Sequence, residues 1–112
     1  MSFIVKVVQP SGILDRNKAF QFDQEINEII ASKADVVLID FQNIEFMDSS
    51  GLGVLVNAIK TVKSARRKIV VCSLNNQVRM LFELAGVDRL LEIYTNREAV
   101  YNALSQAEIS GV

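Results

Sequence analysis

The chain has 112 residues, 50% of them hydrophobic, and its 12 basic and 13 acidic side chains give a formal net charge of −1. This length predicts one domain over residues 1–112, and a chain of this size buries enough apolar surface to need no disulfide. The near-neutral charge argues against a nucleic-acid partner, because nucleic-acid binders neutralise phosphates with a broad basic face.

Histidine and cysteine usage excludes further kinds of site. Histidine is absent and Cys72 is the only cysteine, so the chain alone cannot build a Cys/His zinc site or a histidine-dependent catalytic triad. Cys72 ends an apolar run at residues 69–72, where a thiol acts as a small hydrophobe in a reduced protein. No stretch approaches the roughly 20 apolar residues of a membrane span, and the N-terminus lacks a signal-peptide pattern. We therefore expect a cytoplasmic protein that does not associate with a membrane.

The first half of the chain alternates between strand-like and helix-like patterns. Residues 3–8 are β-rich and predict a strand, and a cluster of turn residues leads to a short strand at residues 13–14 as its antiparallel hairpin partner. A helix is expected to follow Asp15, its N-cap, and to end near Ser32. Residues 36–39 form a continuous apolar run, which is typical of a strand covered on both faces. The apolar residues that give the helix its spacing are Phe22, Ile26, Ile29 and Ile30.

The second half continues the alternation. After a connecting segment at residues 40–48, a second amphipathic helix is expected to end at the basic turn formed by residues 66–68. The three cations of that turn either offset the helix dipole or form a patch for a phosphate or a partner. Residues 69–72 then predict another buried strand. The apolar positions of the second helix are Leu52, Leu55, Val56, Ile59 and Val62.

A third helix, an edge strand and a fourth helix complete the chain. Gly86 is expected to end the third helix, and residues 90–94 are expected to add an edge strand. Met80 and Leu84 fall off the apolar face of the third helix, where they either contact a partner or pack on a second side. The tail after the fourth helix is expected to fray. The apolar positions are Val78, Leu81, Phe82 and Ala85 in the third helix and Val100, Ala103, Leu104 and Ala107 in the fourth.

Strands that alternate with helices predict βαβ units joined by right-handed crossovers. We therefore expect an α/β fold with a mixed, mostly parallel sheet of four to five strands. About four helices and an N-terminal antiparallel hairpin strand complete the expected architecture.

The most informative segment, residues 46–53, opens the second helix and reads Phe-Met-Asp-Ser-Ser-Gly-Leu-Gly. N-capping accounts for one of Asp48, Ser49 and Ser50, whereas the two glycines that follow weaken a helix start. Such a loop leaves a serine accessible. It also follows the C-terminal end of a strand, where sites in open α/β sheets usually lie.

Known catalytic and cofactor motifs do not fit this segment. A nucleophile elbow requires glycine two residues before its serine, and neither serine here has one. Residues 51–56 lack the lysine of a P-loop and the third glycine of a dinucleotide fingerprint. Asp40, Glu45 and Asp48 match no metal-binding motif. We therefore expect no metal, no cofactor and no enzymatic activity, with a small hydrolase that uses Ser49 as an alternative.

The run Asp-Ser-Ser-Gly-Leu-Gly at residues 48–53 is specific to a family. Together with the apolar strand ending in Asp40 and with Gly-Ile-Leu-Asp at residues 12–15, it resembles the STAS domain. The resemblance is to the branch of bacterial anti-sigma factor antagonists that act by partner switching, and the order of elements matches over about the whole chain.

The resemblance implies a regulated binding module. In that family the serine directly after the aspartate, here Ser49, is phosphorylated by a serine kinase that is also the anti-sigma factor. A metal-dependent serine phosphatase reverses the reaction, and only the unmodified protein captures the anti-sigma factor and frees the sigma factor. The alternative is a constitutive STAS adaptor or scaffold subunit without regulated phosphorylation. The implied partner-binding residues are Glu45, Met47, Asp48, Ser49, Ser50, Gly51 and Leu52.

Overall fold

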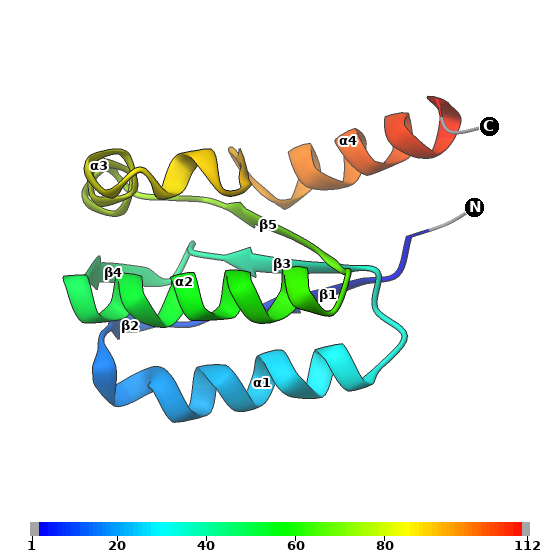
Figure 1. The fold of residues 1–112 in the computed structure, drawn as a ribbon. Coiled ribbons are helices and arrows are strands. Elements are labelled where there is room, and N and C mark those ends of the chain that lie inside the picture. Colours follow the sequence, from blue (N-terminus) through cyan, green and yellow to red (C-terminus); the bar gives the residue numbers. More distant parts are fainter. Residues whose placement is uncertain (1–2, 111–112) are drawn as a thin grey trace.

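A four-stranded parallel sheet forms the centre of the fold (Figure 1). The computed structural model describes residues 3–110, with side chains for residues 3–106, and its central sheet has the strand order β1-β3-β5-β6. Each neighbouring pair in this sheet is parallel. The strands are β1 (Val5–Val8), β3 (Val36–Asp40), β5 (Lys68–Cys72) and β6 (Glu92–Tyr94).

Helices cover both faces of this sheet. In Figure 1, α1 (Ala19–Ala31) and α2 (Ser49–Ser64) lie side by side against one face, and α4 (Arg97–Ser110) lies against the other. The remaining helix, α3 (Asn76–Ala85), packs Phe82 into the same apolar cluster as α1 and α2. The predicted α/β class, the mostly parallel sheet and the four helices are therefore confirmed in the described part of the chain.

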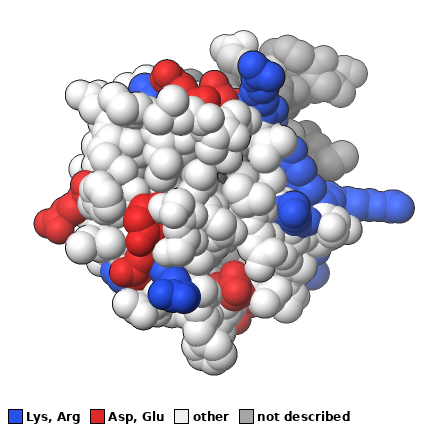
Figure 2. All heavy atoms as spheres, turned by 60° about the vertical axis from the view of Figure 1, so that its left-hand side comes forward, with Lys and Arg blue, Asp and Glu red and all other residues white. Residues whose placement is uncertain are grey.

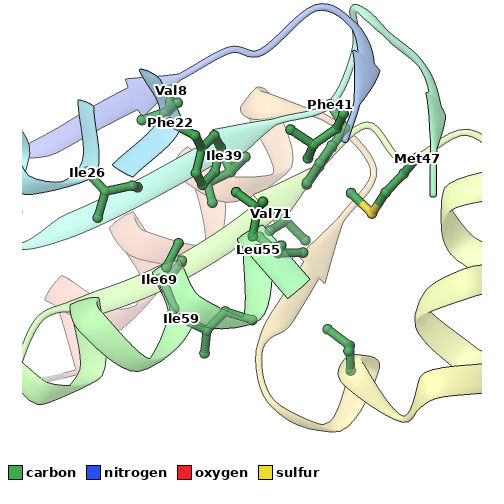
Figure 3. Packing of buried hydrophobic residues seen from close by; sticks show 14 of the residues in the cluster. Val8, Phe22, Ile26, Ile39, Phe41, Met47, Leu55, Ile59, Ile69 and Val71 are labelled. Carbon is green, nitrogen blue, oxygen red and sulfur yellow. The ribbon is translucent and has the colours of Figure 1, made fainter. Parts of the chain in front are cut away.

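Buried side chains on the two faces of the sheet build two apolar clusters. β3 is buried at all of its positions, so its residues contribute alternately to both clusters. The larger cluster joins Ile39 and Val71 to side chains of α1 and α2, as Figure 3 shows. The smaller cluster joins Cys72 to Val100 and Leu104 of α4. Burial raises the pKa of the Cys72 thiol, in agreement with the prediction that it acts as a small hydrophobe.

Local signals set one helix end where the sequence predicts it and another a few residues away. Asp15 accepts the N–H of Asn17 at 2.9 Å and thereby caps a short 3₁₀ turn, Arg16–Lys18, that leads into α1. Gly86 ends α3 with a φ of 74°, a left-handed conformation that glycine adopts without a steric penalty. Gly86 therefore ends α3 as predicted, whereas the predicted N-cap Asp15 caps the 3₁₀ turn and α1 itself begins four residues later, at Ala19.

Two cations of the basic turn after α2 stabilise contacts within the fold. The guanidinium of Arg67 donates hydrogen bonds to backbone carbonyls around the C-terminus of α1, and Lys68 pairs with Glu92 at 2.7 Å. The sequence predicts that these cations offset the dipole at the end of α2. Arg67 does lie at a helix C-terminus, but at that of α1. The three acceptors of Arg67 are the carbonyls of Ile30, Ser32 and Ala34.

The predicted N-terminal antiparallel hairpin is wrong. β2 (Gly12–Leu14) pairs instead with β4 (Ile44–Met47) in a separate two-stranded parallel sheet, and β4 lies inside the predicted connecting segment at residues 40–48. Gly12, with a φ of 73°, redirects the chain after β1 and donates its N–H to the carbonyl of Asn43 at 2.9 Å. The two central residues of β4 are exposed, so this strand lacks the alternating apolar pattern that would have revealed it.

Smaller differences concern the ends of elements. The strand expected at residues 3–8 begins at Val5, and the edge strand expected at residues 90–94 is shorter, Glu92–Tyr94. The side chain of Ala107 and the tail residues 111–112 lie outside the described part of the chain.

Candidate functional site

The carboxylate of Asp48 organises the N-terminus of α2. Its Oδ1 accepts the hydroxyl of Ser50 at 2.7 Å and the N–H of Gly51 at 2.8 Å. The bond from Ser50, and next the bond from Gly51, lower the pKa of Asp48 below its ordinary value. Asp48 is therefore the N-cap of α2 and is negatively charged at neutral pH.

The two serines that follow differ in what their hydroxyls do. Ser50 Oγ donates to Asp48 and also accepts the backbone N–H of Arg16 at 3.1 Å, so it ties the start of α2 to the segment after β2. Ser49 is exposed, and its hydroxyl has no hydrogen-bond partner in the part of the chain whose side chains are described, residues 3–106. Of the two hydroxyls, that of Ser49 is the one available to another molecule.

Close packing between α2 and β2 explains the first glycine of the motif. A Cβ on Gly51 would lie 1.9 Å from the carbonyl oxygen of Leu14, a distance no side chain tolerates. A Cβ on Gly53 would meet no atom within 4 Å. Gly51 is therefore required for the helix to approach β2, whereas Gly53 is not required for packing.

An exposed apolar pair lies on the small sheet beside this helix start. Ile13 of β2 and Phe46 of β4 are opposite each other in the strand register, and they are 49% and 46% exposed. Figure 2 turns this end of the molecule toward the viewer and shows a broad uncharged surface bordered by charged side chains. Adjacent large apolar side chains that are exposed are typical of a protein-binding surface, and Phe46 is three positions before Ser49 in the chain.

Two amide side chains from the start of α3 hold β4 in place. Gln77 accepts the backbone N–H of Met47 at 2.9 Å and donates to the carbonyl of the same residue at 2.7 Å. Asn75, the N-cap of α3, donates to the carbonyls of Ile44 and Glu45 at 3.1 and 3.2 Å. The strand that leads into the serine motif is thus fixed along its outer edge.

The seven residues implied as a partner surface do not all present side chains to solvent. Glu45 is exposed, and Leu52 is half-buried against the larger apolar cluster. Met47 is fully buried, so its side chain packs in the core and is not available for contact. Gly51 is buried as well. The accessible polar groups of the segment come from Asp48, Ser49 and Ser50.

Sequence reasoning missed several residues that shape this surface. Ile13 and Phe46 meet only because β2 and β4 pair, and that pairing has no signal in the local pattern. Gln77 reaches Met47 across 30 positions of sequence. Asn75 could have been found, because an asparagine directly before an apolar helical pattern is an N-cap signal.

Two of the three acidic residues considered as metal ligands, Asp40 and Asp48, are engaged within the fold, and Glu45 is exposed. Burial alone would raise the pKa of Asp40, but hydrogen bonds from Arg97 and from the N–H of Gln42 outweigh it and lower the pKa. Asp48 is held as the helix cap. Among the side chains described, those of residues 3–106, no three of Asp, Glu, Cys or His group as a metal site would require. Within residues 3–110 no helix has both the length and the apolar character to cross a bilayer.

Comparisons with known proteins agree with this arrangement. The STAS domain profile matches residues 4–100. An anti-sigma F factor antagonist of Paenibacillus polymyxa is 30% identical over 106 residues, which cover 94% of this chain and 88% of that protein.

Two solved structures share the fold. The protein TM1081 of Thermotoga maritima superimposes with a TM-score of 0.81 at 24% identity, covering 90% of this chain and 87% of that one. The Bacillus cell fate determinant SpoIIAA in its phosphorylated form gives a TM-score of 0.68 at 21% identity, covering 92% of this chain and 94% of that one. With the profile match and the relative from Paenibacillus, these findings show that the chain belongs to the STAS domain family.

Proposed function

We propose that this protein is an anti-sigma factor antagonist whose binding is switched off by phosphorylation of Ser49. The unmodified protein captures an anti-sigma factor and thereby frees a sigma factor, and it acts as a binding module rather than an enzyme. The observation that carries this proposal is the exposed hydroxyl of Ser49 beside the N-cap of α2, without an internal hydrogen bond in the described chain.

The surface around Ser49 suits a protein partner. The exposed pair Ile13 and Phe46 supplies apolar area of the kind that forms the centre of an interface. Glu45 lies between the buried start of β4 and Phe46 and supplies a polar margin. A partner that covers Phe46 would also cover the start of α2, because only two residues separate Phe46 from Ser49.

Phosphorylation would make this surface unfit for docking. A phosphoserine carries about 1.5 to 2 negative charges, and docking would strip water from them beside the negatively charged Asp48. Loss of complementarity at the centre of an interface commonly costs about 2 kcal/mol or more. At about 1.4 kcal/mol per tenfold, binding would weaken at least roughly thirtyfold.

Relatives support both parts of the proposal. The Paenibacillus relative is named an anti-sigma F factor antagonist, and SpoIIAA, which shares the fold, exists in a phosphorylated form. By resemblance to this family, the partners are a serine kinase that is also the anti-sigma factor and a metal-dependent serine phosphatase. A cytoplasmic location follows from the same resemblance.

Calorimetric titration against the purified anti-sigma factor of the same genome tests the switch. We expect Ser49→Ala to bind like the unmodified protein and Ser49→Asp to bind at least roughly thirtyfold more weakly. Ser105→Asp, which adds the same charge to an exposed position of α4, is the matched control and should bind normally.

Two results would contradict the proposal in different ways. Equal affinity of Ser49→Ala and Ser49→Asp would remove the electrostatic switch and leave a constitutive adaptor. Turnover of a generic ester by the wild-type protein, lost in Ser49→Ala, would indicate a hydrolase instead.

A further inference from the structure

The segment that presents Ser49 is held on both sides of Asp48. On its C-terminal side, Asp48 itself accepts the hydroxyl of Ser50 and the N–H of Gly51. On its N-terminal side, the side-chain amide of Gln77 bonds both backbone groups of Met47. The serine motif is thus fixed at two points that come from different parts of the chain.

The Gln77 amide acts as a neighbouring strand would act. Its oxygen accepts the N–H of Met47 at 2.9 Å and its nitrogen donates to the carbonyl of Met47 at 2.7 Å, so one side chain satisfies both groups. A two-point contact fixes the orientation of the backbone at Met47 as well as its position. Burial of the Met47 side chain adds a third restraint at the same residue.

The free hydroxyl of Ser49 makes this backbone contact important. Because the side chain forms no hydrogen bond within the described chain, the backbone alone fixes the Cβ of Ser49, about which the hydroxyl turns among its rotamers. The backbone enters Ser49 from Met47 and Asp48. A group that holds Met47 therefore sets the position of the phosphate acceptor.

We propose that Gln77 is a positioning residue for Ser49. It holds the loop in the one geometry that the kinase and the anti-sigma factor recognise, so that neither has to order the loop on binding. This inference rests on the proposed function and adds a residue of α3, 28 positions further along the chain, to the site.

Four variants separate positioning from general stability. Gln77→Met keeps the length of the side chain and removes both hydrogen bonds, and Gln77→Glu keeps the acceptor and removes the donor. Gln24→Met makes the same exchange on the exposed surface of α1. Leu104→Ala weakens the apolar cluster on the opposite face of the sheet, far from the loop.

Three measurements are made well below the unfolding temperature of every variant: hydrogen exchange of the Met47 amide, kcat/KM for phosphorylation of Ser49, and affinity for the anti-sigma factor. We expect Gln77→Met to exchange the Met47 amide about tenfold faster and to lose about tenfold in kcat/KM and in affinity. Gln77→Glu sets a carboxylate oxygen against the carbonyl of Met47, so it should lose at least as much as Gln77→Met. Gln24→Met and Leu104→Ala should match the wild type in all three measurements.

Three unfavourable outcomes can be told apart. If the wild-type protein is phosphorylated and binds its partner while Gln77→Met does both equally well, the positioning role is wrong and the proposed function stands. If Leu104→Ala loses kcat/KM and affinity as much as Gln77→Met does, the effect is one of stability and the positioning role is again wrong. If the wild-type protein is neither phosphorylated nor bound, both proposals fall.

Discussion

Ser49 and Ser50 are adjacent, yet the structure gives their hydroxyls opposite roles. The hydroxyl of Ser50 is engaged by Asp48 and by the N–H of Arg16, whereas that of Ser49 is free within the described chain. We predict that the cognate kinase places phosphate on Ser49 alone, as mapped by mass spectrometry of phosphopeptides. Ser50→Ala should still be labelled at Ser49. Phosphate on Ser50, or labelling of Ser49→Ala, would contradict this assignment.

The two glycines of the motif should respond oppositely to alanine. Gly51→Ala places a Cβ against the backbone of Leu14 and should destabilise the fold by about 3 kcal/mol or more, because backbone must shift to relieve the overpacking. Gly53→Ala meets open space on a helix and should stabilise by about 0.5–1 kcal/mol, because alanine favours the helix. Urea denaturation of both variants gives the comparison. A Gly51→Ala protein as stable as the wild type would mean that α2 and β2 are less closely packed than the structure shows.

At the scale of elements, an ion pair joins α4 to the end of β3. Arg97 Nε lies 2.6 Å from Oδ2 of Asp40, whose carboxylate is 1% exposed, while the arginine side chain is 41% exposed. Because the pKa of Asp40 is lowered in the folded protein, its stabilising contribution is present above the ordinary pKa of 3.8 and is lost as the pH falls through the lowered value.

We predict that Arg97→Gln destabilises the protein by about 1–3 kcal/mol at neutral pH, less than for a fully buried pair because Arg97 is partly in water. Without the guanidinium, burial should raise the pKa of Asp40, so the variant gains stability as Asp40 is protonated. The stability curves of variant and wild type should therefore converge below about pH 4. Chemical denaturation across the pH range tests this, with Lys68→Gln, which breaks an exposed pair, as the control. A deficit that stays constant with pH would exclude the ion pair as its cause.

The elements also show what a sequence can and cannot predict. The pattern from Phe22 to Ile30 predicted α1, and the apolar run at residues 36–39 predicted β3, because in both cases burial follows the period of the element. The sequence did not predict β4, because Glu45 and Phe46 are both exposed and the strand therefore lacks an alternating apolar pattern. The N-cap of α2 and the candidate phosphorylation site lie within one short motif and were accessible to sequence reasoning. The contacts from Gln77 come from tertiary structure and were not.

For the whole molecule, we predict that phosphorylation leaves the fold intact. The positive end of the α2 dipole and its free N–H groups favour a phosphate by about 0.3–1 kcal/mol when exposed, and the charge of Asp48 opposes it. A change of about 1 kcal/mol shifts the melting temperature of a domain this size by roughly 4–8 °C, so the partly cancelling terms should shift it by a few degrees at most. Calorimetry of the phosphorylated and unmodified forms measures the difference. A collapse of the thermal transition would show that the switch unfolds the protein rather than changing one surface.

The amides of Asn75 and Gln77 also bear on how the protein avoids aggregation. An exposed apolar strand with an open edge is a template for pairing with other chains, and β4 carries Phe46 on its surface. Its outer edge, however, is already occupied at Ile44, Glu45 and Met47 by side chains of α3. A second molecule can therefore cover the apolar pair but finds these backbone groups on the β4 edge of the small sheet already bonded. The strand that carries Phe46 can thus keep an apolar side chain in water without offering its own edge as a template for another chain.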